Sequence, residues 1–393
     1  MKKLLLATAA SALMAGSAFG EDIKIGVILG FTGPLESITP DMGAGAELAM
    51  KEVTDSGKLL EGSNVIPVRA DSTCIDAAAA TAAAERLITS DGVKGIMGAD
   101  CSGVTGAILS NVVMPNGIVQ ISPSATSPGL SSVEDNGLFF RTSPSDARQG
   151  VVMTEILIEE GIKSVAVTYT NNDYGKGLAD AFQAAYEAAG GTITISVAHE
   201  DGKADYSAEV ATLASAGGDR LVVAGYVDQG GSGIVRAALD SGAFDTFHFP
   251  DGMIGSKLEE NFGTEIDGST GQLPGTDSPG ATAFGELAGD TFDPTGAFAP
   301  ESYDAAALIM LAMQAAGTSD SQVYKDKVME VANAPGEKIY PGELGKALDL
   351  LKAGTDIDYV GATAVELIGP GESAGNYRQI IFKDGKITTV KFR

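Results

Sequence analysis

The chain has 393 residues and is strongly acidic, with 52 Asp and Glu residues against 26 Lys and Arg and a formal net charge of −26. So acidic a surface argues against nucleic acid or an anionic membrane as a partner. A hydrophobic content of 44% excludes an intrinsically disordered chain, and the length suggests two domains.

The first twenty residues have the features of a secretory signal peptide. Lys2 and Lys3 precede an apolar run over residues 4–15, and the small residues of Ala18-Phe19-Gly20 suit a cleavage site. The apolar run is shorter than the roughly 20 residues that a membrane-spanning helix needs. We therefore expect residues 1–20 to be removed and the mature chain to be exported in soluble form.

Short apolar segments alternate with helical patterns along the first third of the chain. We predict strands over residues 23–29, 65–70, 93–97 and 118–122, and helices over about 44–54 and 76–89. This alternation is typical of a parallel sheet with crossover helices.

A second, similar series starts after a strand at about 139–142. We predict helices over about 146–160 and 175–189 and after Asp205, with strands over 164–170, 192–198, 221–224 and 246–249. Residues 268–294 are rich in Gly, Pro, Thr and Asp and are expected to form a crossover or a surface excursion. Helices follow over 303–316, 322–331 and 343–352, and a hairpin over 377–392 ends the chain. The sequence therefore predicts two successive α/β units.

Hydroxyl side chains follow two strands of the first unit. Ser102 comes after the strand over 93–97, and Ser124 and Thr126 follow the strand over 118–122. Ligands of open parallel sheets bind beyond the carboxyl ends of the strands, so these hydroxyls and the nearby backbone N–H groups could cradle a carboxylate. The alternative is that Ser and Thr merely cap the helices that follow.

The strands of the second unit end in two tyrosines and a carboxylate. Tyr174 follows the strand over 164–170, Tyr226 the strand over 221–224, and Asp251 the strand over 246–249. The pattern suits a zwitterion, with its carboxylate on Ser102 and Thr126 and its ammonium on Asp251. Alternatively, the tyrosines are half-buried loop residues and Asp251 is a turn residue before Gly252.

Cys74 and Cys101 are the only cysteines. In an exported protein such a pair indicates a disulfide more often than a metal site or a redox couple, the alternative being two buried free thiols. The two histidines, His199 and His248, lack a nucleophile elbow or metal-ligand spacing. Gly30-x-x-Gly33 does not fit a dinucleotide fingerprint. We expect neither a cofactor nor enzymatic activity.

Several short motifs occur in order along nearly the whole mature chain. They are Glu21-Asp-Ile-Lys-Ile-Gly-Val, Gly33-Pro34, Gly45-Ala-Glu47, Asp71-Ser-Thr-Cys74, Gly98-Ala-Asp-Cys-Ser102, Ile121-Ser-Pro-Ser-Ala-Thr126, Tyr174-Gly-Lys-Gly-Leu178, Asp205-Tyr-Ser207 and Gly225-Tyr226. Because its motifs occur in this order and at this spacing, the chain resembles the periplasmic leucine/isoleucine/valine-binding proteins. These are the substrate-binding subunits of branched-chain amino-acid ABC transporters.

The resemblance implies an α/β fold of the type I periplasmic-binding-protein kind, with two Rossmann-like lobes joined by a three-crossover hinge. It places residues 21–143 and 274–378 in lobe one, and residues 144–273 and 379–393 in lobe two. It also implies a periplasmic, monomeric protein that captures a small carboxylate-bearing ligand, such as an amino acid or a derivative, by lobe closure. The partners implied are the permease subunits of an ABC importer.

Family roles carry over to matching positions. Ser102 and Thr126 match the pair that binds the ligand carboxylate, and Ser124 matches a residue whose backbone carbonyl meets the ammonium. Tyr174 and Tyr226 match aromatic residues of lobe two. Asp251 stands where the family usually has a glutamate that binds the ammonium. The cysteine pair matches the family disulfide.

Four further positions are expected to line the ligand pocket, and some of them differ from the residues of the branched-chain binders. Ile38 stands where branched-chain binders have a tyrosine, and Phe31 is expected in the same loop. Asp100 replaces an apolar residue beside Ser102, and Phe298 matches a wall of the side-chain pocket. These departures put leucine itself in doubt. The alternatives are an aromatic or other organic carboxylate as the ligand, or a ligand-sensing receptor that passes closure to a signalling partner.

Overall fold

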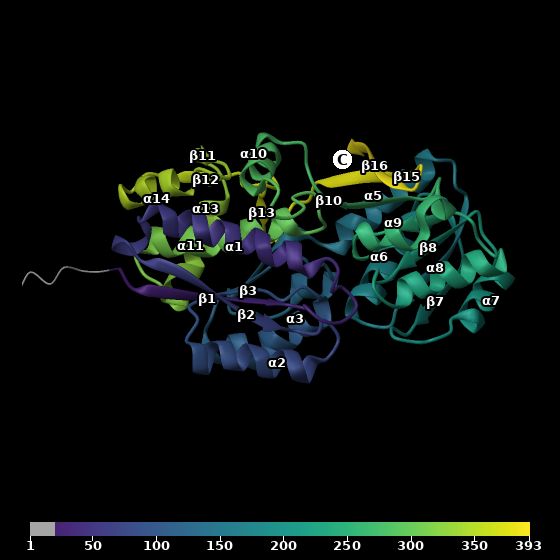
Figure 1. Cartoon of the computed structure of the whole chain (residues 1–393), viewed down its shortest axis with the longest axis horizontal. Coiled ribbons are helices and arrows are strands. Elements are labelled where there is room, and N and C mark those ends of the chain that lie inside the picture. The colour runs from purple at the N-terminus through teal and green to yellow at the C-terminus, as the bar shows by residue number, and fades with distance from the viewer. Residues whose placement is uncertain (1–19) are drawn as a thin grey trace, which may run out of the picture.

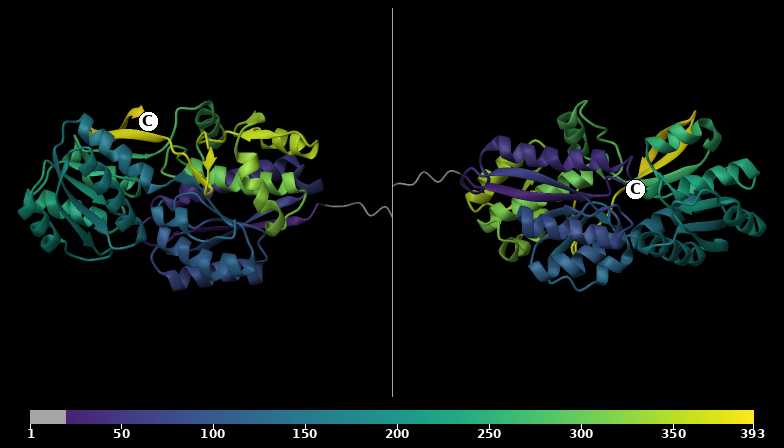
Figure 2. Two further views of the ribbon diagram at one scale, coloured as in Figure 1. Left: turned by 180° about the vertical axis from the view of Figure 1, so that it is seen from behind. Right: turned by 60° about the horizontal axis from the view of Figure 1, so that its bottom comes forward.

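The computed structural model describes residues 20–393. The predicted signal peptide, apart from Gly20, lies outside the described residues. Two lobes lie side by side along the longest axis of the molecule (Figure 1), and they remain distinct in two further views (Figure 2). Within residues 20–393, no helix combines the length and apolarity that crossing a membrane requires.

The first lobe is built on a seven-stranded sheet with the order β13-β14-β5-β4-β3-β1-β2. Its strands are β1 (Asp22–Leu29), β2 (Asn64–Asp71), β3 (Ile96–Gly98), β4 (Gln120–Ser122), β5 (Phe139–Pro144), β13 (Leu367–Ile368) and β14 (Glu372–Ser373). The five strands β1 to β5 pair in parallel. Their apolar runs are buried because helices cover both faces, as parallel sheets require.

The helices of the first lobe flank this sheet. They are α1 (Thr39–Ser56), α2 (Ala77–Arg86), α3 (Ser102–Ile108), α4 (Met114–Asn116), α10 (Pro279–Ala288), α11 (Ala299–Ala316), α12 (Ser321–Tyr324), α13 (Val328–Ala332) and α14 (Leu344–Lys352). In the view of Figure 1, α1, α11 and α14 lie above the sheet, and α2 and α3 lie below it. The almost wholly buried helix α11 packs against α1, α13 and α14, so its first turn is firmly placed.

The second lobe repeats the plan with the strand order β16-β15-β10-β9-β8-β6-β7. Its strands are β6 (Ser164–Thr170), β7 (Thr192–His199), β8 (Arg220–Ala224), β9 (Phe247–Phe249), β10 (Thr270–Pro274), β15 (Tyr377–Lys383) and β16 (Lys386–Phe392). Its helices are α5 (Asp146–Glu159), α6 (Asp173–Ala188), α7 (Ser207–Ala216), α8 (Gly230–Ser241) and α9 (Ser256–Phe262). The predicted α/β class and two-unit architecture are confirmed by these two sheets.

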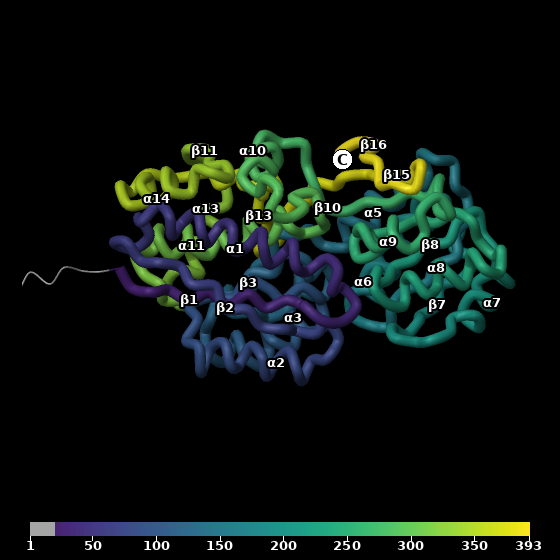
Figure 3. Tube along the Cα trace, viewed as in Figure 1, coloured from purple at the N-terminus to yellow at the C-terminus, as the bar shows by residue number. Residues whose placement is uncertain are grey.

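The chain passes between the two sheets three times. The crossings lie between β5 and α5, between β10 and α10, and between β14 and β15. The trace in Figure 3 shows the C-terminal hairpin, in yellow, on the second lobe, where β15 pairs with β10. Pro144 ends a strand of the first sheet, whereas residues 274, 377 and 378 pair in the second sheet. The expected lobe borders therefore fall one or two residues away from the crossings, because the borders came from a resemblance and the crossings depend on strand pairing.

Several predicted elements differ from the observed ones. Residues 268–294 contain the second crossing, as one of the two expectations had it, but they also hold strand β10 and helix α10, which were not predicted. Strand β10 reads Thr-Gly-Gln-Leu-Pro and has no alternating or β-branched pattern, so only its pairing with β9 and β15 reveals it. The helix predicted over 322–331 is broken into α12, a short 3-10 turn and α13. The small sheet of β11 (Glu337–Ile339) and β12 (Ile357–Tyr359) was not predicted.

Candidate functional site

A small cavity lies between the two lobes. Its walls are Leu35, Asp100, Cys101, Ser102, Ser124 and Phe298 from the first lobe, and Tyr174, Tyr226, Asp251 and Gly252 from the second. Seven of the ten predicted ligand-binding residues are among them. These side chains leave about 20 Å³ of water-accessible space, room for about one water molecule. The walls therefore stand closer together in this structure than they would around an occupant the size of an amino acid.

The first-lobe side of the cavity offers two hydroxyl groups. Ser102 opens helix α3, and its Oγ accepts a hydrogen bond from the Ser127 N–H at 3.1 Å, which leaves its own proton free to donate. Thr126 is fully buried, and its Oγ1 has no hydrogen-bond partner among residues 20–393. The Ser124 hydroxyl, in contrast, donates to the Asp100 carbonyl at 3.0 Å. Ser102 is therefore the hydroxyl of the cavity wall that is able to serve an anionic group, whereas Thr126 is not part of the lining and lies close enough to Asp146 to lower its pKa.

On the second-lobe side, Asp251 is buried and already well supplied with donors. It accepts hydrogen bonds from the Tyr174 hydroxyl at 2.7 Å, the Gln149 amide at 2.6 Å and the Gly252 N–H at 2.7 Å. Burial raises the pKa of the Asp251 carboxyl, and the hydrogen bonds from Tyr174 and Gln149 oppose that shift. The carboxylate that is predicted to meet a ligand ammonium therefore also has three hydrogen-bond donors within the protein.

A second carboxylate, Asp146, lies close to Asp251 and was missed by the sequence reading. Its Oδ1 accepts a hydrogen bond at 3.1 Å from the same Gln149 amide group that serves Asp251. Its Oδ2 is buried and has no partner among the described residues. Burial and the nearby Asp251 charge raise the pKa of Asp146 well above its usual value. Two buried carboxylates thus share one amide donor, and neither forms an ion pair within residues 20–393.

The signal for Asp146 in the sequence is weak. Ser145 and Asp146 stand at the start of helix α5, where the Ser145 hydroxyl caps the helix and an acidic residue in the first turn is ordinary. Only the first crossover, which carries the chain past Thr126, brings Asp146 to the site. The Asp146 N–H donates to the Thr126 carbonyl at 2.8 Å.

Three aromatic residues complete the walls. The rings of Tyr174 and Tyr226 are stacked, with centroids 5.2 Å apart and planes 17° apart. Burial raises the pKa of both tyrosines well above the usual value, so both remain neutral hydrogen-bonding groups. Phe298 adopts a left-handed backbone conformation (φ 62°) directly before α11. That conformation costs a non-glycine residue roughly 1–2 kcal/mol, a cost that the packing of α11 must offset to place the ring.

The sequence and the fold are similar to those of known proteins. A family model described as periplasmic binding protein matches residues 22–336. The chain belongs to the periplasmic binding protein family. A Leu/Ile/Val-binding protein homolog from Brucella melitensis is 31% identical over 340 residues, covering 84% of this chain and 89% of the relative. Proteins of this family bind solutes and are not enzymes.

Two solved structures share the fold at low sequence identity. A leucine binding protein from Thermotoga maritima has a TM-score of 0.79 and 22% identity, and covers 94% of this chain and 98% of its own. A solute binding protein of an ABC transporter from Rhodopseudomonas palustris, in complex with p-hydroxybenzoic acid, has a TM-score of 0.75 and 18% identity, covering 95% and 97%. The two-lobed fold is therefore shared by binding proteins whose ligands differ.

In this periplasmic binding protein, the Asp100 carboxylate is hydrogen-bonded to nearby loops. Its Oδ2 accepts a hydrogen bond from the Gly30 N–H at 3.0 Å, and its Oδ1 accepts one from the Ser72 hydroxyl at 2.9 Å. Burial raises the pKa of the Asp100 carboxyl, and these hydrogen bonds lower it. The carboxylate that we expected to face the ligand thus ties together the loops that follow β1, β2 and β3.

Three predicted residues, Thr126, Phe31 and Ile38, do not line this cavity. Phe31 packs beneath the Arg69 guanidinium, whose carbon lies 5.1 Å from the ring centroid. Ile38 is buried and lines a separate, larger cavity. Leu35 occupies the cavity wall from the same loop instead. An isolated apolar residue in a loop gives no sequence pattern that could have distinguished Leu35 from its neighbours.

The predicted disulfide is present. Cys74 and Cys101 are bonded, with Cα atoms 5.1 Å apart, and the bond joins the loop after β2 to the loop that carries Ser102. Together with Asp100, these residues form the one group of potential metal ligands found within residues 20–393. Because the sulfur atoms are bonded to each other, they are not available as thiolate ligands.

Proposed function

We propose that this periplasmic binding protein is the ligand-capturing subunit of an ABC importer, and that its ligand is an amino acid or a close derivative held between the lobes. One observation carries the proposal. Asp251 lines the same cavity as Ser102, whose hydroxyl is free to donate, and shares its amide donor with the buried Asp146; neither carboxylate has an ion-pair partner within residues 20–393.

Charge complementarity assigns the two ends of such a ligand. The ligand carboxylate accepts a hydrogen bond from Ser102, and its ammonium lies toward Asp251 and Asp146. A buried carboxylate pair is costly unless a cation or a proton neutralises part of its charge. The ammonium supplies that charge, and the stacked rings of Tyr174 and Tyr226 hold the apolar part. Relatives named for leucine or for leucine, isoleucine and valine support this assignment.

An aromatic or other organic carboxylate is the second candidate. The three hydrogen bonds that Asp251 receives within the protein satisfy its oxygens without an ammonium. The Rhodopseudomonas palustris neighbour, solved with p-hydroxybenzoic acid, shows that the fold accommodates such a ligand. A receptor that passes closure to a signalling protein stays a third alternative. We further propose a monomeric protein, exported to the periplasm after cleavage at Gly20, that delivers its ligand to permease subunits.

A thermal-shift screen of amino acids and organic acids tests the proposal. A ligand at 100 times its Kd adds about 2.7 kcal/mol to the free energy of unfolding, so binders raise the melting temperature of the mature chain. We expect the strongest shifts from α-amino acids. Shifts confined to acids without an amino group would favour the second candidate, and no shift from either set would contradict both.

Ser102→Ala should weaken ligand binding roughly 10- to 150-fold. The hydroxyl donates to an ionised carboxylate, and such a hydrogen bond contributes about 1.5–3 kcal/mol. Calorimetric titration of the wild type and the variant with the best screening hit measures the loss. Ser132→Ala, at an exposed hydroxyl on the short 3-10 turn after β4, is the matched control and should leave affinity unchanged. Unchanged affinity in a folded Ser102→Ala variant would remove Ser102 from the site.

Ligand addition should reduce the radius of gyration of the protein. The cavity draws its walls from both lobes, so a ligand contacts all of them only when the lobes are closed, and it shifts the population toward that form. The structure contains closing contacts: the Ser37 N–H donates to the Asp228 carboxylate at 2.8 Å, and the Asp228 N–H donates to the Pro34 carbonyl at 3.2 Å. Small-angle X-ray scattering with and without saturating ligand measures the change, and superimposable curves would argue against closure.

A further inference from the structure

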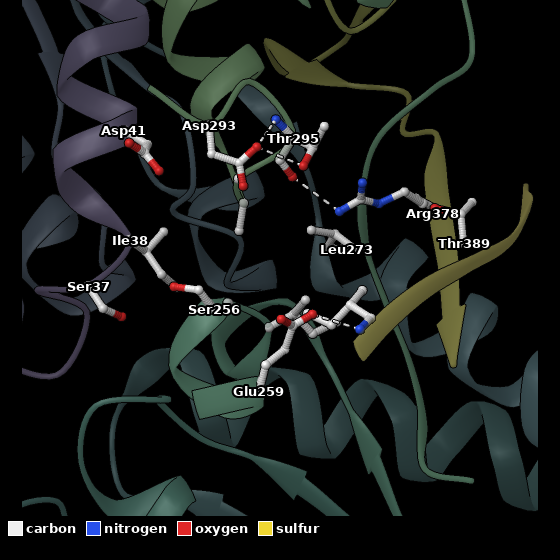
Figure 4. Close-up of a pocket in the computed structure, with 15 residues that line it drawn as sticks. Ser37, Ile38, Asp41, Ser256, Glu259, Leu273, Asp293, Thr295, Arg378 and Thr389 are labelled. Atoms are coloured by element: carbon white, nitrogen blue, oxygen red, sulfur yellow. Dashed lines mark hydrogen bonds between the residues drawn. The ribbon is translucent and has the colours of Figure 1, made fainter. Parts of the chain in front are cut away.

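A second cavity, of about 220 Å³, also lies between the lobes. None of its lining residues belongs to the first cavity. One wall comes from the start of α1 and the loop before α11 in the first lobe, and the other from the loop after β9, from β10 and from the C-terminal hairpin of the second lobe (Figure 4). The function proposed above does not use this space.

The second-lobe wall carries a cation, Arg378, that forms no ion pair within the described part of the chain. Arg378 stands at the start of β15, directly after the third crossing, and is partly buried. Its guanidinium donates to the Thr295 carbonyl at 3.1 Å and forms no ion pair with any residue in the range 20–393. Burial lowers the pKa of Arg378, and the charges of Asp293 and Glu301 oppose that shift. Most of its N–H donors are thus available to a group inside the cavity.

The first-lobe wall carries two carboxylates. Asp293 accepts hydrogen bonds from the N–H of Thr295 at 2.9 Å and from its hydroxyl at 2.8 Å, both on Oδ1. Asp41, in the first turn of α1, forms no ion pair within the described part of the chain. Burial and the nearby Asp293 raise the pKa of Asp41. In Figure 4, Asp41 and Arg378 lie on opposite sides of the cavity.

The fourth charged residue of the cavity is already neutralised. Glu259 forms an ion pair with Lys386 at 2.8 Å and accepts a hydrogen bond from the Ile387 N–H at 2.7 Å. The charges left to an occupant are therefore those of Asp41, Asp293 and Arg378. Apolar side chains, including Ile38, Ile254 and Leu273, line the space beside them.

We propose that this second cavity binds a small zwitterion, with its carboxylate on Arg378 and its ammonium on Asp41 and Asp293. Arginine presents a planar fork that pairs with both oxygens of a carboxylate. A simple anion would leave the two carboxylates unpaired, and a metal cation would leave Arg378 unpaired. A molecule that carries both charges satisfies both walls, and the apolar residues suit a short methylene chain between its charged ends.

Such an occupant contacts both lobes. Asp41 and Asp293 belong to the first lobe and Arg378 to the second, so binding favours the closed form. Any ligand that closes the first cavity then binds more tightly when the second is filled, and the coupling is reciprocal. The assignment of this site does not depend on the ligand of the first cavity.

A series of ω-amino acids of increasing length tests the proposal: glycine, β-alanine, 4-aminobutanoate and 5-aminopentanoate. Butanoate and butylamine, which carry one charge each, are the matched controls. Saturation-transfer NMR and calorimetry on the mature chain measure binding. We expect at least one member of the series to bind with a Kd below about 10 mM, and both single-charge controls to bind at least tenfold more weakly.

Variants locate the binding. Arg378→Gln and Asp41→Asn should each reduce the affinity of that probe at least tenfold, whereas Ser102→Ala in the first cavity should leave it unchanged. Arg236→Gln, at a half-buried arginine of α8 that lies outside both cavities, is the control for loss of a positive charge. Circular dichroism confirms folding, and Arg378→Lys, which keeps the charge, should retain part of the affinity. Failure of every length to bind, equal binding of butanoate, or loss of binding in Ser102→Ala but not in Arg378→Gln would each overturn the proposal.

Discussion

Asp251→Asn should weaken the binding of an α-amino acid ligand by about 2–5 kcal/mol, or roughly 30- to 5,000-fold. The substitution removes the charge that faces the ligand ammonium and leaves the ammonium poorly paired in a buried site. In the wild type, the Gln149 amide donates to Asp251 at 2.6 Å. The substitution places a second N–H₂ donor against that amide. Because Gln149 Oε1 accepts from Gln272 at 3.2 Å, Gln149 cannot turn over without losing that bond.

The measurement is a calorimetric titration of both proteins with the best amino acid and with its deaminated analogue. Asp251 keeps three protein donors when the ammonium is missing, so the wild type should still bind the analogue, at least tenfold more weakly. The preference for the amino acid should shrink in Asp251→Asn. Equal wild-type affinity for the two ligands would end the amino-acid assignment and leave the carboxylate cradle standing.

Replacing both cysteines, as Cys74→Ser with Cys101→Ser, should lower the free energy of unfolding by about 3–4 kcal/mol in the chain-entropy model. The bond closes a loop with a sequence separation of 27 residues, and its loss frees the unfolded chain. Urea denaturation of the wild type and the double variant measures the difference. A further effect is weaker ligand binding, because Cys101 directly precedes Ser102.

Reduction provides the control for this prediction. The wild type treated with a reductant should approach the stability of the double variant, and the variant should not respond. Thiol titration of the denatured, unreduced wild type should find no free sulfhydryl, because no free cysteine is present in the described chain. A loss of stability under about 1 kcal/mol would mean that the bond constrains the unfolded chain far less than the loop length predicts.

Much of the fold followed from local patterns in the sequence. Buried parallel strands such as β8 contain continuous apolar runs, and the apolar residues of amphipathic helices such as α6 recur every 3.6 residues, so both are visible within a window of about ten residues. Strand β10 escaped this reading because its five residues are held by neighbours on both sides and not by their own propensity. Its residues acquire strand geometry only once β9 and β15 are in place.

The residues of the candidate site likewise fall into those that the sequence indicates and those that only the structure reveals. Tyr226 and Asp251 follow predicted strands of the second lobe, and parallel strands bring their carboxyl ends to one edge of a sheet, so the convergence of these two residues could be predicted from the chain. Asp146 and Arg378 gave no such indication, because each stands next to a crossing between the lobes. What they face depends on how two separately folded sheets are set against each other. The sequence by itself determined which strand ends meet within each lobe. The tertiary structure alone decided which charges of one lobe meet those of the other, because contacts between the lobes depend on long-range packing that no local pattern encodes.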